Sequence, residues 1–216
     1  SSKFFIARPP QSSVTYENMT FMQQRAVDLG VDMNQKFLYI CGKAGSGKTQ
    51  VALEICRRLK GRVQAAAGTG KAASNFGGPT IHGMFGWSFS FSEGHTLSGT
   101  KLTKFRADYE NIDTLVIDEI NSNGAEILAH MDEYLRAGFN PKQPFGGKRM
   151  IFLGDPAQLP PVMGEPIDGQ GNGGYVMATK ARGSRGVRQW RMHATAKGQE
   201  LYRKYFRENC IFLQKS

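Results

Sequence analysis

The chain has 216 residues, a length that suits one large domain or one domain with a small appendage. Hydrophobic residues make up 40% of it and charged residues 21%, as in an ordinary globular protein with a sizeable core, and no apolar run approaches the length of a transmembrane helix. The net charge of +10 favours a polyanionic partner, nucleic acid first, although a basic protein without such a partner stays an alternative.

The N-terminus and the cysteines bear on the compartment. The N-terminal apolar stretch is too short for a secretory signal, and Cys41, Cys56 and Cys210 have no metal-binding spacing. We therefore expect an intracellular protein, in the nucleus or mitochondrion of a eukaryote or in the cytoplasm of a prokaryote. Cys41 and Cys56 fall on an expected strand and helix, where a buried, unreactive thiol is the expected state.

The first half of the chain predicts alternating helices and strands. Residues 1–18, which contain Pro9-Pro10, predict an irregular arm. A stretch rich in glycine, serine and phenylalanine occupies 77–100, and a charged helical piece follows at 101–111. The remaining elements are helices at 20–30, 49–61 and 69–76, the first two closed by Gly30 and Gly61, and strands at 37–41 and 62–67.

The second half contains two apolar runs that end in acids, "DTLVIDEI" (113–120) and "RMIFLGD" (149–155), a pattern typical of strands buried on both faces. A helix is expected between them at 124–138. A helix at 195–206 and a short strand at 210–214 end the chain. Between these parts, residues 163–189 hold seven glycines and four basic residues and predict a mobile loop or a small subdomain; the basic residues are Lys180, Arg182, Arg185 and Arg188.

Strands that alternate with helices indicate an α/β fold, a mostly parallel sheet with helices on both faces. In such sheets, ligands bind at the carboxyl ends of the strands. The Gly-rich loop at 41–50, Asp118-Glu119 and Gly154-Asp155 all lie at those ends. We therefore expect one site there.

The Gly-rich loop predicts a phosphate site. Residues 42–49 match G-x-x-x-x-G-K-[ST], with a strand before the loop and a helix after it. Backbone N–H groups and the helix N-terminus attract phosphate, Lys48 is suited to the β- and γ-phosphates, and the Thr49 hydroxyl is suited to Mg²⁺. The predicted nucleotide-binding residues of the loop are Gly42, Ala44, Gly45, Ser46, Gly47, Lys48, Thr49 and Gln50.

The acids after the 113–118 run complete this chemistry. We expect Asp118 to hold Mg²⁺, directly or through water, and Glu119 to orient and deprotonate the water that attacks the γ-phosphate. The sequence therefore predicts a nucleoside triphosphatase that uses ATP and Mg²⁺.

Beyond the phosphate site, the sequence resembles superfamily 1 helicases, in the branch of the RecD-like and PIF-type DNA helicases. The most specific motif is "GDPAQLPPV" (154–162). The resemblance covers about residues 19–162 and includes, in order, "MTFMQQRAV" (19–27), "TGKAA" (69–73), "TIHGMFG" (80–86), "DEIN" (118–121) and "FGG" (145–147).

The resemblance implies further nucleotide contacts. Gln158 is expected to sense the γ-phosphate through its amide, with a surface glutamine in a turn as the alternative. Gln24 is expected to contact the adenine, with Gln23 as the other possible register and a solvated helix residue as the alternative.

The resemblance also implies single-strand contacts by Thr69, Lys71, Thr80 and His82. Lys71 as an exposed helix cation and His82 as a core histidine are the alternatives. Phe85, like Trp87, is expected to stack on bases, with core packing as an equal alternative.

Some parts of the family pattern differ here. Asn121 stands where the family usually has serine. In the family, the strand at the end of this chain leads to an arginine and a second RecA-like domain, so the arginine finger is expected beyond Ser216 and low activity is expected of this chain alone. The expected division is an arm at 1–18, a RecA-like ATPase core at 19–162, a wedge-like insertion at 163–189 and a return to the core at 190–216.

These observations favour the motor domain of an ATP-dependent DNA helicase, with roles in DNA repair and recombination. Its expected partners are single-stranded or fork DNA and a second RecA-like domain of the same protein, and no membrane. Two alternatives stay open. One is a P-loop phosphotransferase that acts on a small molecule, and the other is a nucleotide-gated clamp on single strands that does not hydrolyse ATP.

Overall fold

The computed structural model describes residues 13–87, 97–155 and 185–214. Its centre is a five-stranded sheet in the order β2-β3-β4-β1-β5, in which every neighbouring pair is parallel. This confirms the α/β fold with a parallel sheet that the sequence predicts. The strands are β1 (Phe37–Gly42), β2 (Val63–Ala67), β3 (Thr114–Asp118), β4 (Arg149–Gly154) and β5 (Cys210–Leu213).

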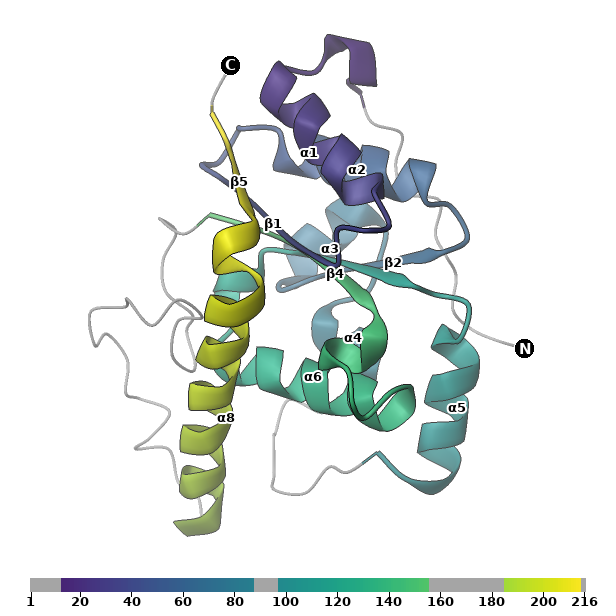
Figure 1. The fold of residues 1–216 in the computed structure, drawn as a ribbon, viewed down its shortest axis with the longest axis vertical. Coiled ribbons are helices and arrows are strands. Elements are labelled where there is room, and N and C mark those ends of the chain that lie inside the picture. The colour runs from purple at the N-terminus through teal and green to yellow at the C-terminus, as the bar shows by residue number, and fades with distance from the viewer. Residues whose placement is uncertain (1–12, 88–96, 156–184, 215–216) are drawn as a thin grey trace.

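Helices cover both faces of the sheet (Figure 1). On one face α1 and α2 pack over the strands, and on the other α4, α5, α6 and α8 enclose a second, aromatic-rich cluster of buried side chains. Among the described residues, no helix combines the length and apolarity needed to cross a membrane. The helices are α1 (Phe21–Val31), α2 (Lys48–Arg58), α3 (Gly70–Phe76), α4 (Ile81–Phe85), α5 (Gly99–Tyr109), α6 (Ala125–Gly138) and α8 (Arg185–Tyr205).

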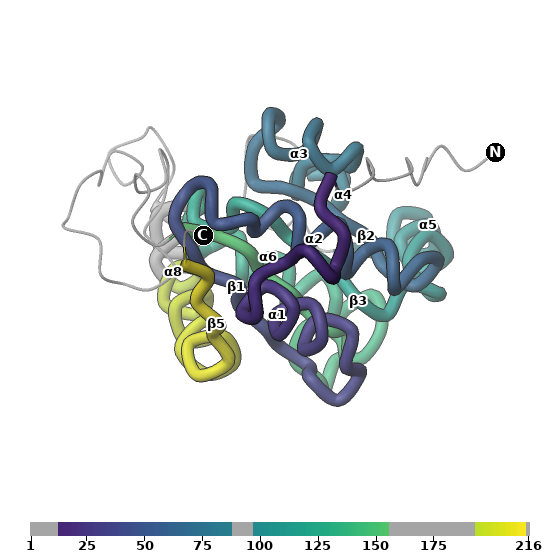
Figure 2. The backbone as a smooth tube through the Cα atoms, turned by 90° about the horizontal axis from the view of Figure 1, so that it is seen from above, coloured from purple at the N-terminus to yellow at the C-terminus, as the bar shows by residue number. Residues whose placement is uncertain are grey.

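Short 3-10 turns complete the described chain: η1 (Tyr16–Asn18), η2 (Ile120–Ser122), η3 (Pro144–Gly147) and η4 (Arg207–Asn209). Every residue of β3 and of β4 is buried, as expected for central strands covered on both faces. Seen from above, β5 and α8 lie at one edge of the molecule, and β2 and α5 lie at the other (Figure 2).

Two elements differ from the sequence prediction. The short helix α4 lies inside the stretch 77–100, where Thr80 caps its start and Gly86, in the left-handed region, ends it. Helix α8 begins at Arg185, so the predicted boundary between 189 and 190 falls inside a continuous helix. The first part of this helix was not predicted because glycines near its start are unfavourable in helices. Within α8, Gly198 lies so close to α6 that a Cβ atom would stand 1.7 Å from the Ala125 carbonyl oxygen.

A buried arginine joins α1 to the sheet. Arg149 begins β4, and its Nη2 donates to the carbonyl oxygens of Gly30 and Asp32, each at 2.8 Å, at the C-terminal end of α1. Its Nη1 donates to the Thr114 hydroxyl of β3 at 2.9 Å. Because these bonds hold the C-terminal end of α1, the opposite end of the helix, which carries Gln23, reaches the phosphate loop in a defined position.

Candidate active site

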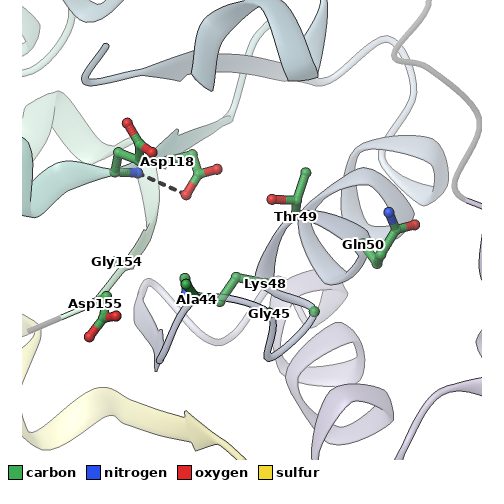
Figure 3. A pocket seen from close by; sticks show the side chains of 10 residues that line it. Ala44, Gly45, Lys48, Thr49, Gln50, Asp118, Gly154 and Asp155 are labelled. Carbon is green, nitrogen blue, oxygen red and sulfur yellow. Dashed lines mark hydrogen bonds between the residues drawn. The ribbon is translucent and has the colours of Figure 1, made fainter. Parts of the chain in front are cut away.

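The phosphate loop connects β1 to α2 and borders a cavity of about 340 Å³ (Figure 3). Gly45 and Gly47 have φ values of 81° and 83°, which glycine adopts without a steric penalty. Gly47 precedes α2 and no side chain caps that helix, so the positive N-terminal end of α2 faces the loop without a capping side chain. The cavity is lined by Ala44, Gly45, Gly47, Lys48, Thr49, Gln50, Asp118, Glu119, Gly154 and Asp155.

Most of the predicted loop residues therefore meet at one cavity. The exceptions are Gly42 and Ser46, which support the loop from beneath. Ser46 is buried, and a Cβ atom on Gly42 would stand 2.4 Å from the Ser46 hydroxyl oxygen. Gln50 lines the rim, but its side chain points away from Asp118 and Thr49 (Figure 3).

The ammonium group of Lys48 lies over the loop. Its Nζ donates to the carbonyl oxygens of Gly42 at 2.5 Å and of Lys43 at 3.1 Å. These bonds turn the charge back over the glycine-rich turn, beside the N-terminus of α2. The arrangement concentrates positive potential where a β- or γ-phosphate is expected to bind.

Asp118 ends β3 on the opposite wall of the cavity. Its side chain is 6% exposed, and its Oδ1 accepts a hydrogen bond from the Glu119 backbone N–H at 2.8 Å. Burial, the largest cause, raises the pKa of Asp118 to about 6. The hydrogen bond from the Glu119 N–H and the charge of Lys48 lower this pKa, whereas the negative charge of Glu119 raises it. The carboxylate is therefore costly to keep charged without a cation.

The donor atoms at this wall fit Mg²⁺. Thr49, Asp118 and Asp155 line the same cavity and offer hydroxyl and carboxylate oxygens, the hard ligands that Mg²⁺ prefers. The described residues contain no group of three His, Cys, Asp or Glu side chains that could hold a metal ion. Mg²⁺ usually takes one or two protein carboxylates and fills its remaining positions with water and phosphate. A bound cation would also relieve the cost of the buried Asp118 charge.

Glu119, the predicted water-activating residue, has an unusual backbone. Its φ and ψ are 50° and 40°, in the left-handed region that is uncommon for residues other than glycine. Its Oε2 accepts a hydrogen bond from the Thr69 hydroxyl at 2.5 Å. A residue predicted to contact a single strand therefore contacts the predicted general base, which the sequence did not indicate.

Of the two glutamines considered for the adenine, only Gln23 reaches the loop. Its Nε2 donates to the Ser46 carbonyl oxygen at 3.0 Å, and its Oε1 accepts from the Thr20 backbone N–H at 2.8 Å in a capping box. The Gln24 amide instead donates to the Tyr16 carbonyl oxygen at 2.9 Å. The structure thus favours the alternative register, Gln23, because Thr20 caps α1 and directs the third residue of the helix at the loop; the contact with adenine stays a prediction.

The predicted single-strand residues lie beyond the carboxyl end of β2. Thr69 and Thr80 cap α3 and α4, and an isolated bridge pairs Thr80 with Ala67 at the end of β2. Lys71 is exposed. His82 is half-buried, and burial lowers its pKa, with the charge of His130 adding to the effect.

The prediction that Phe85 stacks on bases is wrong for this structure. Phe85 is 7% exposed and stacks on Trp87, with ring centroids 4.5 Å apart, in the cluster beneath the sheet. Core packing, the alternative, is what the structure shows, because the apolar face of α4 turns towards α5 and α6. Gln158 lies outside the described residues.

Two features of the site were not predicted from the sequence. Asn121, at the position where the resemblance expects serine, accepts a hydrogen bond from the Tyr39 hydroxyl at 2.7 Å, and a Cβ atom on Gly154 would stand 1.9 Å from its Oδ1. Cys41 Sγ lies 2.7 Å from Cys210 Sγ, across β1 and β5. The hydrogen bond with the Cys210 thiol, and after it burial, raises the pKa of Cys41 well above its ordinary value. Neither contact could be read from the sequence without the strand order.

Comparison with known proteins agrees with this geometry. ATP-dependent DNA helicase PIF1 of Saccharomyces cerevisiae is 38% identical over 136 residues, which cover 60% of this chain and 16% of that protein. The human protein of the same name is 32% identical over 143 residues, 65% of this chain and 22% of that protein. The chain thus spans about a fifth of the length of these relatives.

Solved structures show the same fold. Bacteroides Pif1 bound to ssDNA matches with a TM-score of 0.59 and 32% identity, over 67% of this chain and 34% of that one. Bacteroides sp Pif1 in complex with ADP-AlF4 matches with a TM-score of 0.65 and 26% identity, over 91% of this chain and 42% of that one. A family model described as PIF1-like helicase matches residues 17–172. That model covers more than half of the sequence, and the chain therefore belongs to the PIF1-like helicase family.

Proposed function

We propose that this chain is the nucleotide-binding motor domain of an ATP-dependent DNA helicase, which couples ATP hydrolysis to movement on single-stranded DNA and to strand separation. The observation that carries the proposal is the single cavity where the phosphate loop, Asp118 and Glu119 meet. Family membership and the ssDNA and ADP-AlF4 complexes of Bacteroides Pif1 support it. The phosphotransferase alternative leaves the single-strand motifs at 69–73 and 80–86 without a purpose.

On the nucleotide side, the loop N–H groups and Lys48 bind the β- and γ-phosphates, and Gln23 stands where it can turn from Ser46 towards the base. Thr49 and Asp118 are the residues that would hold Mg²⁺, which neutralises phosphate charge when bound. Glu119 orients the attacking water and takes its proton. A cation from a second RecA-like domain then stabilises the transferred phosphoryl group, so we expect very slow hydrolysis by this chain alone.

On the DNA side, the proposed contacts are Lys71, Thr80 and His82 in the segments that follow β2. The net charge of +10 supports a polyanionic partner. The same proposal implies that the protein is intracellular, where ATP and DNA are found.

Single-turnover hydrolysis of radiolabelled ATP, with protein in excess, tests the proposal because it detects slow chemistry. We expect Mg²⁺-dependent release of inorganic phosphate that Lys48→Ala abolishes. The matched control is Lys60→Ala, which removes an exposed lysine just after α2 and should keep the parent rate. Hydrolysis that survives Lys48→Ala would remove the loop from the site, and phosphate transfer to a small acceptor would favour the phosphotransferase instead.

A further inference from the structure

One hydroxyl group connects the strand-binding side of the molecule to the hydrolytic side. Thr69 precedes α3, and its Oγ1 accepts a hydrogen bond from the Ala72 backbone N–H at 3.3 Å, which caps the helix. The same Oγ1 donates to Glu119 Oε2 at 2.5 Å. This bond fixes the direction in which the Glu119 carboxylate faces, turned towards the start of α3.

The backbone around this hydroxyl is packed just as closely. Gly68 N–H donates to the Asp118 carbonyl oxygen at 2.8 Å. A Cβ atom on Gly68 would stand 2.4 Å from the Glu119 carbonyl oxygen and 2.3 Å from both Ser122 Oγ and Asn123 Nδ2. The segment between β2 and α3 therefore has no room to move against the turn that carries Glu119, so a displacement of one is transmitted to the other.

The Glu119 backbone also depends on its surroundings. Its φ of 50° is maintained by neighbouring contacts, among them the Glu119 N–H bond to Asp118 Oδ1. The Thr69 bond is a further contact, and it fixes the side chain rather than the backbone. Removing that bond frees the carboxylate without removing the contacts that hold the turn.

The chemistry of a hydroxyl makes its two possible partners exclusive. Threonine has one O–H proton, so Thr69 can donate to Glu119 or to a phosphate or sugar oxygen of a strand, but not to both. Its acceptor role towards Ala72 is the same in either case. A strand oxygen that accepts this hydrogen bond releases the Glu119 carboxylate, which can then turn towards the attacking water.

We propose that Thr69 is a positioning residue that holds the Glu119 carboxylate at the start of α3 until an oxygen of single-stranded nucleic acid accepts the Thr69 hydroxyl hydrogen bond instead, which makes ATP hydrolysis depend on the strand. This inference rests on the proposed function and adds the means by which the two sides of the domain communicate. Because such coupling is reciprocal, loss of the Glu119 carboxylate must also tighten strand binding.

The rate test uses single-turnover ATP hydrolysis by this chain, with and without a saturating oligodeoxythymidine. Thr69→Val keeps the shape and removes the donor, and Thr69→Ser keeps both donor and cap. We expect Thr69→Val to raise the strand-free rate by about fivefold and to bring the ratio of rates with and without DNA close to one. Thr69→Ser should keep the parent ratio, whereas a mere folding defect would lower both rates together.

The second measurement needs no turnover. Fluorescence anisotropy with the same oligonucleotide should show about fivefold tighter binding by Glu119→Ala than by the parent, and no such gain when Thr69→Val is also present. A parent-like strand-free rate and DNA ratio in Thr69→Val would overturn the inference, as would unchanged strand affinity in Glu119→Ala. Hydrolysis that does not depend on Lys48 would instead overturn the proposed function itself.

Discussion

Replacing Asp118 with asparagine should make the nucleotide-free protein more stable, although it removes a residue of the proposed site. Asparagine keeps the size of the side chain and an oxygen that can accept the Glu119 N–H bond. It removes a buried negative charge that has no cation beside it within hydrogen-bond distance among the described contacts. The pKa of Asp118 is raised to about 6, from 3.8 in a model peptide, with burial as the main cause.

The size and pH dependence of the effect follow from this shift. The difference between about 6 and 3.8 is about two pH units, each worth about 1.4 kcal/mol, so Asp118→Asn should add up to about 3 kcal/mol at pH 8. Because the pKa of Asp118 is higher in the folded state, its contribution to stability is fully present below the pKa of the unfolded chain, where the group is protonated in both states. This contribution is lost as the pH rises through the folded-state pKa and the buried group becomes charged. Asparagine is never charged, so its advantage over aspartate grows with pH. The advantage of asparagine should therefore fall to about half at pH 5.

Urea unfolding at pH 5 and pH 8, without nucleotide, measures the difference. Glu110→Gln is the matched control, because it neutralises an exposed carboxylate after α5 and should leave the free energy of unfolding nearly unchanged. With MgATP the order should reverse, since the ligand stabilises only the chain that can hold the cation. An Asp118→Asn protein that is less stable than the parent at pH 8, or a gain that is equal at both pH values, would refute the reasoning.

Three further predictions follow from the described contacts. Glu119→Gln should keep MgATP affinity, measured by equilibrium dialysis, but stop hydrolysis, because an amide cannot take the proton of water; loss of binding would make Glu119 a structural residue. Lys71→Ala should weaken oligonucleotide binding for all sequences and reduce the slope against log salt by about one, and an unchanged slope would remove Lys71 from the interface. Gly154→Ala should lower the free energy of unfolding by about 1–3 kcal/mol, because its Cβ atom would meet Asn121 Oδ1. Adding Asn121→Ser should recover most of that loss, and no recovery would place the strain elsewhere.

Much of the fold was predictable because its signals are local. The apolar runs that became β3 and β4 are buried along their whole lengths, and the phosphate motif sits between a strand and a helix as its chemistry requires. Asp118 and Glu119 could be placed at the same edge because parallel strands bring their carboxyl ends together. The residues of the cavity were therefore largely identified in advance.

The contacts that were missed depend on tertiary structure. The register of Gln23 was decided by the capping box with Thr20, and the burial of Phe85 by the helices that pack around α4. The Thr69–Glu119 bond joins the ends of two neighbouring strands, and the Cys41–Cys210 contact joins β1 to the last strand. The hydrophobic periodicity of the sequence identifies the strands, but it does not indicate which strands become neighbours in the sheet.

The strand order also has a consequence for folding of the chain during its synthesis on the ribosome. β1, which carries the phosphate loop, pairs on one side with β4 and on the other with β5, and both are made long after it. Contacts between distant parts of a chain form late and slowly. A nascent chain therefore carries a complete phosphate motif well before it has a nucleotide site, because the cavity also needs Asp118 and Asp155, and β1 is paired on both sides only when β5, Cys210–Leu213, has emerged.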